Sequence, residues 1–356
     1  MMNKILIPGG AGFVGSSLAI GLKQRYPRWQ IMCLDNLKRR GSELNLKRFK
    51  EHDIEFIHGD IRQDSDLDLP NFKKINLILD CSAEPSVLAG FSSPRYVLQT
   101  NLFGTINLLE LARKLEAQFL FLSTSRIYPI ATVKSLDFIE TETRFKIAPH
   151  QNLPGISELG IAEEFPLDGA RSLYGATKLA SELLITEYRE AYQLPAIVNR
   201  CGVIAGPGQM GKVDQGVFTL WMAAHYFQKA LSYIGYGGTG KQVRDVLHID
   251  DLVDLVDYQI HHFSGLDGDI LNVGGGAKNS LSLRETTQLC AEITGKSITI
   301  EPIILERKGD VPWYVTDTTK IQAKTHWQPQ HSPQSVLMDI YDWLVRNEQF
   351  LKPILG

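Results

Sequence analysis

Apolar runs alternate with amphipathic segments over the first two hundred residues of the chain. The runs that predict buried strands are residues 4–8, 30–34, 54–58, 75–80, 118–128 and 196–200. The segments with a helical spacing of apolar residues are 16–26, 101–115 and 174–192. This alternation is typical of an α/β fold with a doubly wound parallel sheet, here of about seven strands. Beyond residue 200 the chain changes to short segments punctuated by glycine, which indicates a second, smaller domain.

A glycine-rich turn joins the first predicted strand to the first predicted helix. Gly9, Gly12 and Gly15 form a Gly-x-x-Gly-x-x-Gly pattern. Glycines let the backbone turn tightly and approach a pyrophosphate, which binds the free N–H groups at a helix N-terminus. Strand, glycine loop and helix together are the context that a dinucleotide site requires. The alternative is a glycine-rich turn without a ligand.

An acid ends the second predicted strand. Asp35 lies about 20 residues after the last glycine, where a carboxylate binds the adenosine ribose of a dinucleotide. An acid there disfavours a 2′-phosphate and predicts NAD rather than NADP, although the basic residues 38–40 weaken this distinction. Asp60 and Ile61 follow the third strand and are candidates to hold the adenine edge. By composition alone, a turn acid is the simpler interpretation of Asp60.

Hydroxyl residues end the apolar run at 118–128. The carboxyl ends of the strands form the ligand crevice in a parallel sheet of this kind. Thr124 is therefore a candidate to hydrogen-bond a reacting hydroxyl. Residues 134–169 are long, polar and interrupted by Pro149 and Pro154, which predicts an active-site loop rather than a domain linker.

Tyr174 and Lys178 lie four residues apart at the start of a predicted helix, so their side chains share one face. A phenol has a pKa of about 10 and is mostly protonated at neutral pH. A neighbouring ammonium favours the phenolate, which would then act as a general base. Taken alone, the pair is explained as well by a buried Tyr beside a snorkelling Lys. The glycine loop at the N-terminus favours the catalytic interpretation of this pair.

The composition limits the classes of protein to which this chain can belong. The chain has 356 residues, of which 44% are hydrophobic and 22% charged, with a formal net charge of −3. These values fit a soluble globular protein and predict no nucleic-acid or membrane surface. The four cysteines lie far apart without a Cys-x-x-Cys pair, which predicts neither a disulfide framework nor zinc and fits a reduced cytoplasm. We expect no signal peptide, because the N-terminus runs directly into the glycines, and no membrane span.

Two basic clusters lie in the second half of the chain. Arg244, in a segment with Lys241, and Arg307 are suited to gripping phosphate through their guanidinium groups. Surface arginines in ordinary salt bridges are the simpler alternative. His248 is followed by Asp250 and Asp251, but no third ligand recurs at metal spacing, so we predict no metal and interpret His248 as structural.

The glycine loop, Asp35, Thr124 and the Tyr174/Lys178 pair, in this order, resemble the extended short-chain dehydrogenase/reductase superfamily, and specifically its nucleotide-sugar epimerases and dehydratases. The resemblance covers nearly the whole chain. It implies Thr124, Tyr174 and Lys178 as catalytic residues. It implies cofactor contacts from Gly9, Gly12, Phe13, Val14, Gly15, Asp35, Asn36, Asp60, Ile61, Ala83, Asn101, Tyr174 and Lys178. It implies substrate contacts from Thr124, Arg244 and Arg307, which would hold the diphosphate, and from Tyr314, which would lie near the nucleotide.

Within the superfamily, residues 140–144, 213–216, 240–248 and 279–283 look most like the CDP-paratose (CDP-tyvelose) 2-epimerase branch. Three positions depart from common patterns. The usual His of the fourth-strand motif is replaced in the stretch 79–84, Leu173 stands where many relatives have Pro before the Tyr, and Val203 stands where galactose epimerases have a phosphate-binding Asn. The grip on the substrate is therefore not that of a galactose epimerase.

The resemblance implies a cycle with no net oxidation. Tyr174 would remove a hydroxyl proton while tightly bound NAD takes hydride from the same sugar carbon, and the keto-sugar would be reduced again on its other face. The inverted carbon would be C2 for a paratose-type substrate and C4 for a galactose-type one. Dehydratases of the superfamily carry Asp-Glu directly after the catalytic Thr, where this chain has Ser125 and Arg126. A dehydratase, a decarboxylase, a plain reductase and a non-catalytic NAD-binding protein stay as alternatives.

From the same resemblance we expect residues 1–198 and 225–270 to form an NAD-binding Rossmann domain. Residues 199–224 and 271–356 would form the domain that binds the nucleotide-sugar. The apolar helices at 101–115 and 174–192 would pair across a two-fold axis and make a homodimer, an expectation that rests on analogy. No nucleic acid or membrane partner is expected.

Overall fold

The computed structural model describes residues 4–212 and 215–356. Two positions of the branch-specific stretch at 213–216, Val213 and Asp214, therefore lie outside the described residues. The chain divides into two compact units. The first comprises residues 4–127 with Leu173–Arg200 and Leu252–Leu271, and the second comprises Tyr128–Ser172, Cys201–Asp251 and Asn272–Gly356.

The first unit is built on a seven-stranded sheet with the order β14-β10-β5-β4-β1-β2-β3. Its strands are β1 (Lys4–Pro8), β2 (Gln30–Asp35), β3 (Glu55–His58), β4 (Leu77–Asp80), β5 (Gln118–Thr124), β10 (Ala196–Cys201) and β14 (Ile270–Val273). β1 pairs in parallel with both β2 and β4, so the strand order reverses between β1 and β4. In a sheet of this kind the ligand crevice lies outside the carboxyl ends of the strands at that reversal. The predicted doubly wound parallel sheet is confirmed.

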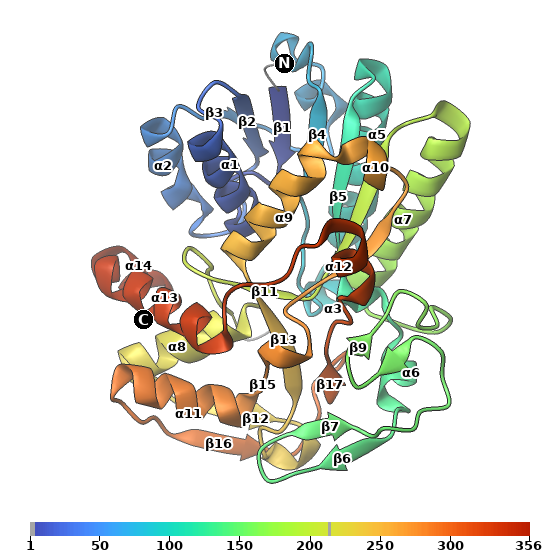
Figure 1. Ribbon diagram of the computed structural model, residues 1–356. Helices are drawn as coiled ribbons and strands as arrows, with labels where there is room; N and C mark the ends of the chain where they lie inside the picture. The colour runs from blue at the N-terminus through green and yellow to red at the C-terminus, as the bar shows by residue number, and fades with distance from the viewer. Residues whose placement is uncertain (1–3, 213–214) are drawn as a thin grey trace. The chain divides into compact units, whose positions relative to one another are not determined.

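Helices connect these strands. They are α1 (Phe13–Arg25), α2 (Asn45–Glu51), α3 (Ala89–Ser92), α4 (Pro94–Leu98), α5 (Gly104–Leu115), α7 (Leu173–Tyr192), α9 (Ile249–His261) and α10 (Phe263–Leu266). Short 3-10 turns cover Ser42–Leu44, Asp64–Asp66, Pro70–Phe72 and Ser125–Ile127, and a π-helical turn at Gln99–Phe103 leads into α5. Figure 1 shows α5 and α7 together on one side of the sheet, and α1 with α9 on the other.

The core of the first unit fills the space between the sheet and its helices. Apolar side chains of β1, β4 and β5 pack against Leu108 and Leu109 of α5 and Ile185 of α7. On the other face, Gly21 of α1 lies against Val253 of α9, and a Cβ at residue 21 would come within 2.7 Å of a Val253 methyl group. Burial on both faces explains why the sequence of these strands is nearly continuously apolar.

The second unit has smaller sheets. A four-stranded sheet contains β11 (Val203–Ala205), β13 (Val243–His248), β15 (Ser280–Ser282) and β17 (Trp313–Tyr314), with β13 at its centre. Two-stranded pairs are β12 (Leu231–Ile234) with β16 (Ile300–Ile303), β6 (Phe138–Glu140) with β7 (Phe145–Ile147), and β8 (Ile156–Ser157) with β9 (Gly160–Ile161). The predicted loop at 134–169 thus contains two short hairpins.

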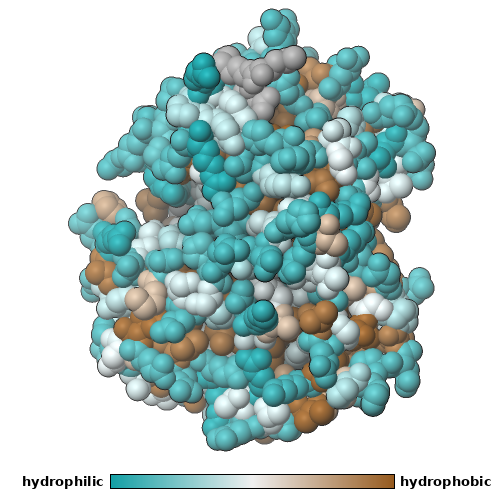
Figure 2. Space-filling model, in the orientation of Figure 1, coloured by the Kyte–Doolittle hydropathy of each residue, from teal (hydrophilic) through white to brown (hydrophobic). Residues whose placement is uncertain are grey.

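Helices of the second unit close a separate core. They are α6 (Ile130–Lys134), α8 (Val217–Phe227), α11 (Leu283–Thr294), α12 (Thr319–Thr325), α13 (Pro333–Arg346) and α14 (Glu348–Leu355). Apolar residues of α8, α11 and α13 pack on one another, with Trp221, Met222 and Ile340 among those that are buried. Figure 2 shows a mostly hydrophilic visible face, with hydrophobic residues gathered over the region of α8 and α11. Within the described residues, no helix combines the length and apolar character needed to cross a membrane.

The packing divides the chain differently from the predicted domain boundaries. Residues 128–172 and 225–251 were expected in the first domain, but both pack within the second unit. The physical reason is hydrogen bonding inside that unit, because β13 pairs with β11, β15 and β17, and Ile161 N–H donates to the Val315 carbonyl. Which unit binds the cofactor and which the sugar nucleotide stays a prediction.

Candidate active site

The glycine loop between β1 and α1 has no room for a side chain at Gly9 or Gly15. Gly9 has a positive φ of 71°, and a Cβ there would lie 2.7 Å from the Cys81 carbonyl oxygen. A Cβ on Gly15 would lie 2.4 Å from the Gly9 carbonyl oxygen. Gly12 is the N-cap of α1 and offers no side-chain hydrogen bond to the helix. The first N–H groups of α1 are thus uncapped by side chains, which fits the binding of a pyrophosphate there.

Phe13 and Val14 lie in the first turn of α1, where the predicted cofactor contacts place them. The carbonyl oxygen of Phe13 accepts hydrogen bonds from the hydroxyls of Ser16 and Ser17. These bonds fix the first turn of the helix on the protein side. Neither side chain is fully buried, so both are accessible to a ligand at the loop.

Asp35 ends β2 directly beside this loop. Its carboxylate accepts hydrogen bonds from the Ala11 N–H at 3.1 Å and from the Leu37 N–H at 2.8 Å. Burial raises the pKa of the Asp35 carboxyl, and these backbone N–H groups oppose that rise. The carboxylate is therefore held at the glycine loop, in the position that a ribose-binding acid requires.

Asp60 and Asn36 form a second polar group beside the first. Asn36 Nδ2 donates to Asp60 Oδ2 at 3.0 Å, and the Arg62 guanidinium binds both oxygens of the same carboxylate. Burial alone would raise the pKa of Asp60, but the bonds from Arg62 and Asn36 lower it to about 2. Asp60 also accepts from the Arg62 N–H at 3.0 Å, as a turn acid does, and its contact with the adenine edge stays a prediction.

A cationic pair covers an aromatic ring near this group. The centre of the Tyr96 ring lies 3.2 Å from Lys38 Nζ and 4.9 Å from the Arg62 guanidinium carbon.

Ile61 is buried, and a Cβ on Gly104 would approach its side chain to within 2.4 Å. Ile61 is therefore packed against the start of α5 through its side chain.

Asn101 links the segment after β4 to α7. Its side-chain amide accepts from the Glu84 N–H at 2.7 Å and donates to the Glu84 carbonyl at 3.1 Å. The same amide group lies 3.3 Å from the Thr177 hydroxyl. Asn101 thus holds the backbone around Ala83 beside α7 while being fully buried itself. Its role in the structure is to position this segment, and a cofactor contact stays a prediction.

The three predicted catalytic residues lie in the first unit and are nearly buried. Thr124 at the end of β5 is 7% exposed, Tyr174 in the first turn of α7 is 8% exposed, and Lys178 one turn later is 2% exposed. Lys178 Nζ donates to the Ser82 carbonyl oxygen at 3.4 Å, and it lies 4.1 Å from the Phe121 ring centre. Burial strengthens the effect of the ammonium on any group near it, because the local dielectric is low.

A buried ion pair joins α7 to the central strands. Glu182 Oε2 accepts from Arg200 of β10 at 2.8 Å and 3.0 Å, and Glu182 Oε1 accepts a short hydrogen bond from the Ser123 hydroxyl. Ser123 precedes Thr124, and Glu182 lies one turn after Lys178. The pair therefore fixes the register of the Tyr174 helix against the strand that carries Thr124. This ion pair was not predicted from the sequence, although the four-residue spacing of Lys178 and Glu182 indicates that both lie on one face of the helix.

Asp80 is a second residue whose role the sequence did not reveal. It is fully buried and accepts from the Ser82 N–H at 2.9 Å and the Ser82 hydroxyl at 2.5 Å. Burial raises the pKa of the Asp80 carboxyl, and the positive charge of Lys178 opposes the rise. The carbonyl oxygen of Ser82 also accepts a hydrogen bond from Lys178. Asp80 is therefore connected to the predicted catalytic lysine through Ser82.

Three of the four predicted substrate residues, Arg244, Arg307 and Tyr314, belong to the second unit, whereas Thr124 belongs to the first. Arg244 on β13 is paired in register with Tyr314 on β17. Asp310 Oδ1 accepts from Arg244 at 2.7 Å, and the Arg307 guanidinium lies 3.8 Å from Asp310 Oδ2. One carboxylate thus holds two guanidinium groups side by side, and Lys241 is engaged separately with Glu140. Sequence reasoning did not assign this role to Asp310.

These features define a Rossmann-type dinucleotide enzyme with a Tyr/Lys pair of the short-chain dehydrogenase type. The chain belongs to the NAD dependent epimerase/dehydratase family, whose model matches residues 5–274. The predicted resemblance is therefore confirmed at the level of the family.

Known proteins of the family align along nearly the whole chain. CDP-paratose 2-epimerase of Salmonella typhi is 30% identical over 96% of this chain and 98% of that protein. UDP-glucuronate 4-epimerase of Thermodesulfobacterium geofontis is 26% identical over 99% of both chains. The crystal structure of dTDP-glucose 4,6-dehydratase from Bacillus anthracis in complex with NAD superposes with a TM-score of 0.76 at 26% identity, over 99% of both chains. These relatives are epimerases and dehydratases, so the chain is an enzyme of this family.

Proposed function

We propose that this protein is an NAD-dependent epimerase of a nucleotide-diphosphate sugar, with CDP-paratose or CDP-tyvelose as substrate and inversion at C2. The observation that carries the proposal is the nearly buried Tyr174/Lys178 pair on a helix fixed to the strand of Thr124. The identity to a CDP-paratose 2-epimerase over almost the full length of both chains supports the choice of sugar nucleotide. The predicted cytoplasmic location stays a prediction.

NAD fits the first unit on three structural grounds. Gly9 and Gly15 leave no room for a Cβ in the tight turn, the start of α1 has no side-chain cap, and the Asp35 carboxylate is held beside the loop. When bound, NAD would take hydride from the sugar carbon and return it. The protein would have to retain the cofactor between the two steps, because the reaction has no net oxidation.

The side chains would then handle the proton. Tyr174 would take the proton of the sugar hydroxyl as a general base, and Lys178 would stabilise the phenolate by its charge. The bond from Lys178 to the Ser82 carbonyl fixes where that charge lies. Thr124 would hydrogen-bond the reacting oxygen, and the keto-sugar would have to reorient before hydride returns to its other face.

The arginine pair of the second unit suits a diphosphate. Guanidinium groups bind phosphate oxygens bidentately, and two adjacent ones match the two phosphates of a nucleotide-diphosphate sugar. Asp310 would keep Arg244 and Arg307 close to each other against their mutual repulsion. Tyr314, next to Arg244 across the β13–β17 pair, would lie near the nucleotide.

A 4,6-dehydratase is the second candidate, because dehydratases match with comparable identity. Elimination of water needs an acid and a base in addition to the redox residues. The 3-10 turn Ser125–Ile127 directly after Thr124 contains a serine, an arginine and an isoleucine and no carboxylate. This sequence disfavours the dehydratase.

The test is incubation of the purified protein with CDP-, UDP-, GDP- and dTDP-sugars in deuterated water, followed by NMR of the products. We expect inversion at C2 of one CDP-sugar without solvent deuterium at that carbon. A product that has lost water or carbon dioxide would replace the epimerase with a dehydratase or decarboxylase. Inversion at C4 of a UDP-sugar would keep the epimerase but change its substrate.

The Tyr174→Phe variant tests the catalytic assignment separately. Removal of the phenol hydroxyl leaves the ring in place, so we expect NAD to stay bound while turnover falls by a factor of at least about 100. Absorbance of the bound cofactor measures retention, and NMR measures turnover. Turnover near that of the wild type would remove Tyr174 from the proposed mechanism.

A further inference from the structure

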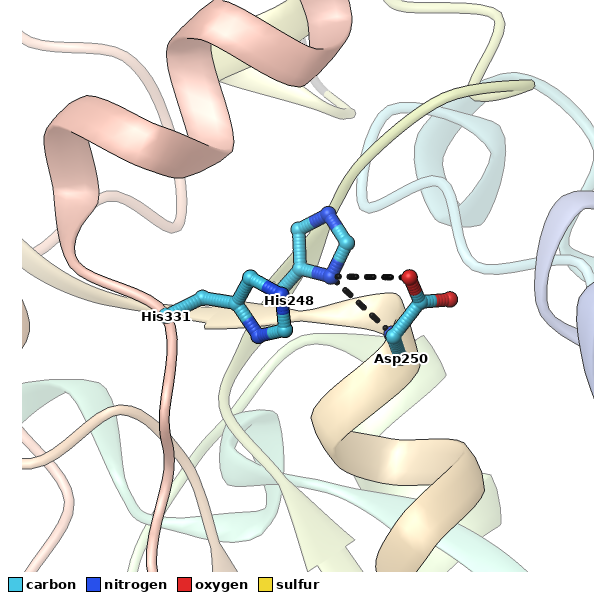
Figure 3. Close-up of side chains that lie close together, drawn as sticks. All are labelled: His248, Asp250 and His331. Carbon is cyan, nitrogen blue, oxygen red and sulfur yellow. Dashed lines mark hydrogen bonds and ion pairs between the residues drawn. The ribbon is translucent and has the colours of Figure 1, made fainter.

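Two histidines and an aspartate meet in the second unit, away from every residue assigned above. His248 ends β13, Asp250 lies in the first turn of α9, and His331 lies in the segment that precedes α13 (Figure 3). One ligand atom of each lies within 4.8 Å of the others. The sequence spacing did not reveal this group, because its third member comes from a distant part of the chain.

The hydrogen bond that His248 accepts defines its tautomer. Nδ1 accepts from the Asp250 N–H at 3.1 Å, so in the neutral ring the hydrogen is on Nε2. Nδ1 also lies 3.7 Å from the Asp250 carboxylate. The Nδ1 lone pair therefore points towards Asp250 and is engaged by the Asp250 N–H, which a cation bound to Nδ1 would have to displace.

Carboxylates face the opposite nitrogens of both rings. His331 Nδ1 lies 2.8 Å from Asp251 Oδ1, and Asp251 is itself fully buried and accepts two further backbone N–H groups. His248 Nε2 is buried, has no hydrogen-bond partner among the described residues, and lies 3.5 Å from the Asp339 carboxylate. Metal-binding histidines commonly donate their second nitrogen to a carboxylate in this way.

We propose that His248 Nδ1, His331 Nε2 and the Asp250 carboxylate bind a divalent transition metal of the zinc class, with water as the fourth ligand. Imidazole and carboxylate ligands suit zinc, whereas magnesium prefers oxygen ligands alone. Three carboxylates around the two rings supply negative charge for a divalent cation.

Binding requires local movement of the three ligands. The two imidazole rings are stacked, with centres 4.1 Å apart and planes at 25°, so one ring must turn before both lone pairs meet at one point. Zinc with ligands at 2.0–2.1 Å brings the ligand atoms to about 3.3 Å from one another. The Asp250 side chain is 67% exposed and can swing inward, and the metal replaces the hydrogen bond that its N–H makes to Nδ1.

A metal here would tie the segment before α13 to the end of β13. Both segments belong to the second unit and contribute to the support of its core helices. The role is therefore structural, independent of the proposed epimerase activity. Loss of the metal would lower the thermal stability of the protein without removing Tyr174, Lys178 or Thr124 from their positions.

The experiment uses the untagged full-length protein after treatment with a chelator. Metal content after gel filtration with excess Zn²⁺ or Mg²⁺ gives the stoichiometry and selectivity, and thermal unfolding gives the stabilisation. We expect one Zn²⁺ per chain, no retained Mg²⁺, and a higher unfolding temperature with Zn²⁺. X-ray absorption of the zinc protein should show two imidazole ligands and no sulfur, which tests the site without any substitution.

Matched variants locate the ion. His331→Asn keeps a donor to Asp251 but removes Nε2. Asp250→Asn changes an exposed carboxylate. His326→Asn is the control, because it alters an exposed histidine shortly before His331 in the sequence. We expect zinc affinity to fall by a factor of at least about 100 in the first two and to stay unchanged in the third. No stoichiometric zinc in the wild type, sulfur ligands, or unchanged affinity in both His331→Asn and Asp250→Asn would each overturn the proposal.

Discussion

The buried Glu182–Arg200 ion pair holds α7 against the central strands at the candidate site. Their side chains are 2% and 5% exposed, so each charge depends on the other for compensation. Breaking a buried pair by removing one partner leaves an uncompensated charge and costs about 3–5 kcal/mol. Because Glu182 also binds Ser123, its loss affects both the stability and the placement of Thr124 relative to α7.

We therefore expect Glu182→Gln to lower the free energy of unfolding by about 3 kcal/mol. Urea denaturation of the purified variant measures this change, with Glu187→Gln as the control because Glu187 lies on the same helix and is exposed. A loss as small as that of the control would mean that the pair contributes no net stability.

Asp35 offers a direct test of cofactor binding. Replacement by Asn keeps the shape of the side chain but removes the charge that would accept the ribose hydroxyls. Hydrogen bonds to charged groups contribute about 1.5–3 kcal/mol, so NAD affinity should fall about 10- to 100-fold. Calorimetric titration of cofactor-free protein measures it. Asp53→Asn is the control, because the Asp53 side chain is 98% exposed, and an unchanged affinity in Asp35→Asn would contradict the ribose contact.

Individual site residues were predictable where the relevant signal is local in sequence. The glycine loop and Asp35 could be placed because a strand, a turn and a helix follow one another over a short stretch. Asp80 and Asp310 were missed as organisers, since their partners Lys178 and Arg244 lie far along the chain. A contact of that kind is created by folding and has no spacing that a sequence pattern can display.

At the level of elements, the apolar runs identified all the early strands but not every boundary. α1 begins at Phe13, three residues before the predicted start at Ser16, because the glycine loop itself ends at the N-cap. β5 ends at Thr124, since the chain turns into a 3-10 segment there. The π-helical turn Gln99–Phe103 was not predicted, because its apolar spacing is hardly different from that of the helix it joins.

The contact between α5 and α7 contains a hydrogen bond that depends on pH. The Tyr188 hydroxyl donates to Glu110 at 2.7 Å. Burial, together with that bond, raises the pKa of Tyr188 to about 12, above the value of about 10 in the unfolded chain. The stabilisation is therefore fully present below pH 10 and is lost as the pH rises towards 12. It should amount to less than about 1 kcal/mol, because the group is partly exposed to solvent.

We expect the stability difference between wild type and Tyr188→Phe to be flat near neutral pH and to move in favour of the variant above about pH 10. Chemical denaturation at a series of pH values measures the difference, in which the ionisation of the other tyrosines cancels. A difference independent of pH over the whole range would mean that Tyr188 titrates alike in the folded and unfolded chains.

At the scale of the whole molecule, the parallel sheet was predictable and the division of the chain was not. The order of strands and helices along the sequence specifies the sheet, because each crossover returns to a neighbouring strand. Residues 128–172 and 225–251 lie between segments of the sheet in sequence, yet their hydrogen bonds go to β15, β17 and the segment around Val315. Proximity in sequence was the wrong guide for these two insertions.

The predicted homodimer would use the outer faces of α5 and α7. Leu183 and Tyr192 of α7 are 63% and 54% exposed, and Phe103, just before α5, is 57% exposed. Large apolar side chains at such positions gain free energy when a second copy covers them. Two helices from each copy would form a four-helix bundle, as the resemblance to the superfamily implies.

We therefore expect light scattering at micromolar concentration to give twice the mass of one chain for the wild type and the mass of one chain for Leu183→Glu. The charge would be buried without a partner in the dimer but exposed in the monomer, so the monomer should stay folded. Phe350→Glu, which changes an equally exposed apolar residue of α14, should leave the dimer intact. A monomeric wild type would end the dimer hypothesis, and a dimer that survives Leu183→Glu but not Phe350→Glu would transfer the interface to α14.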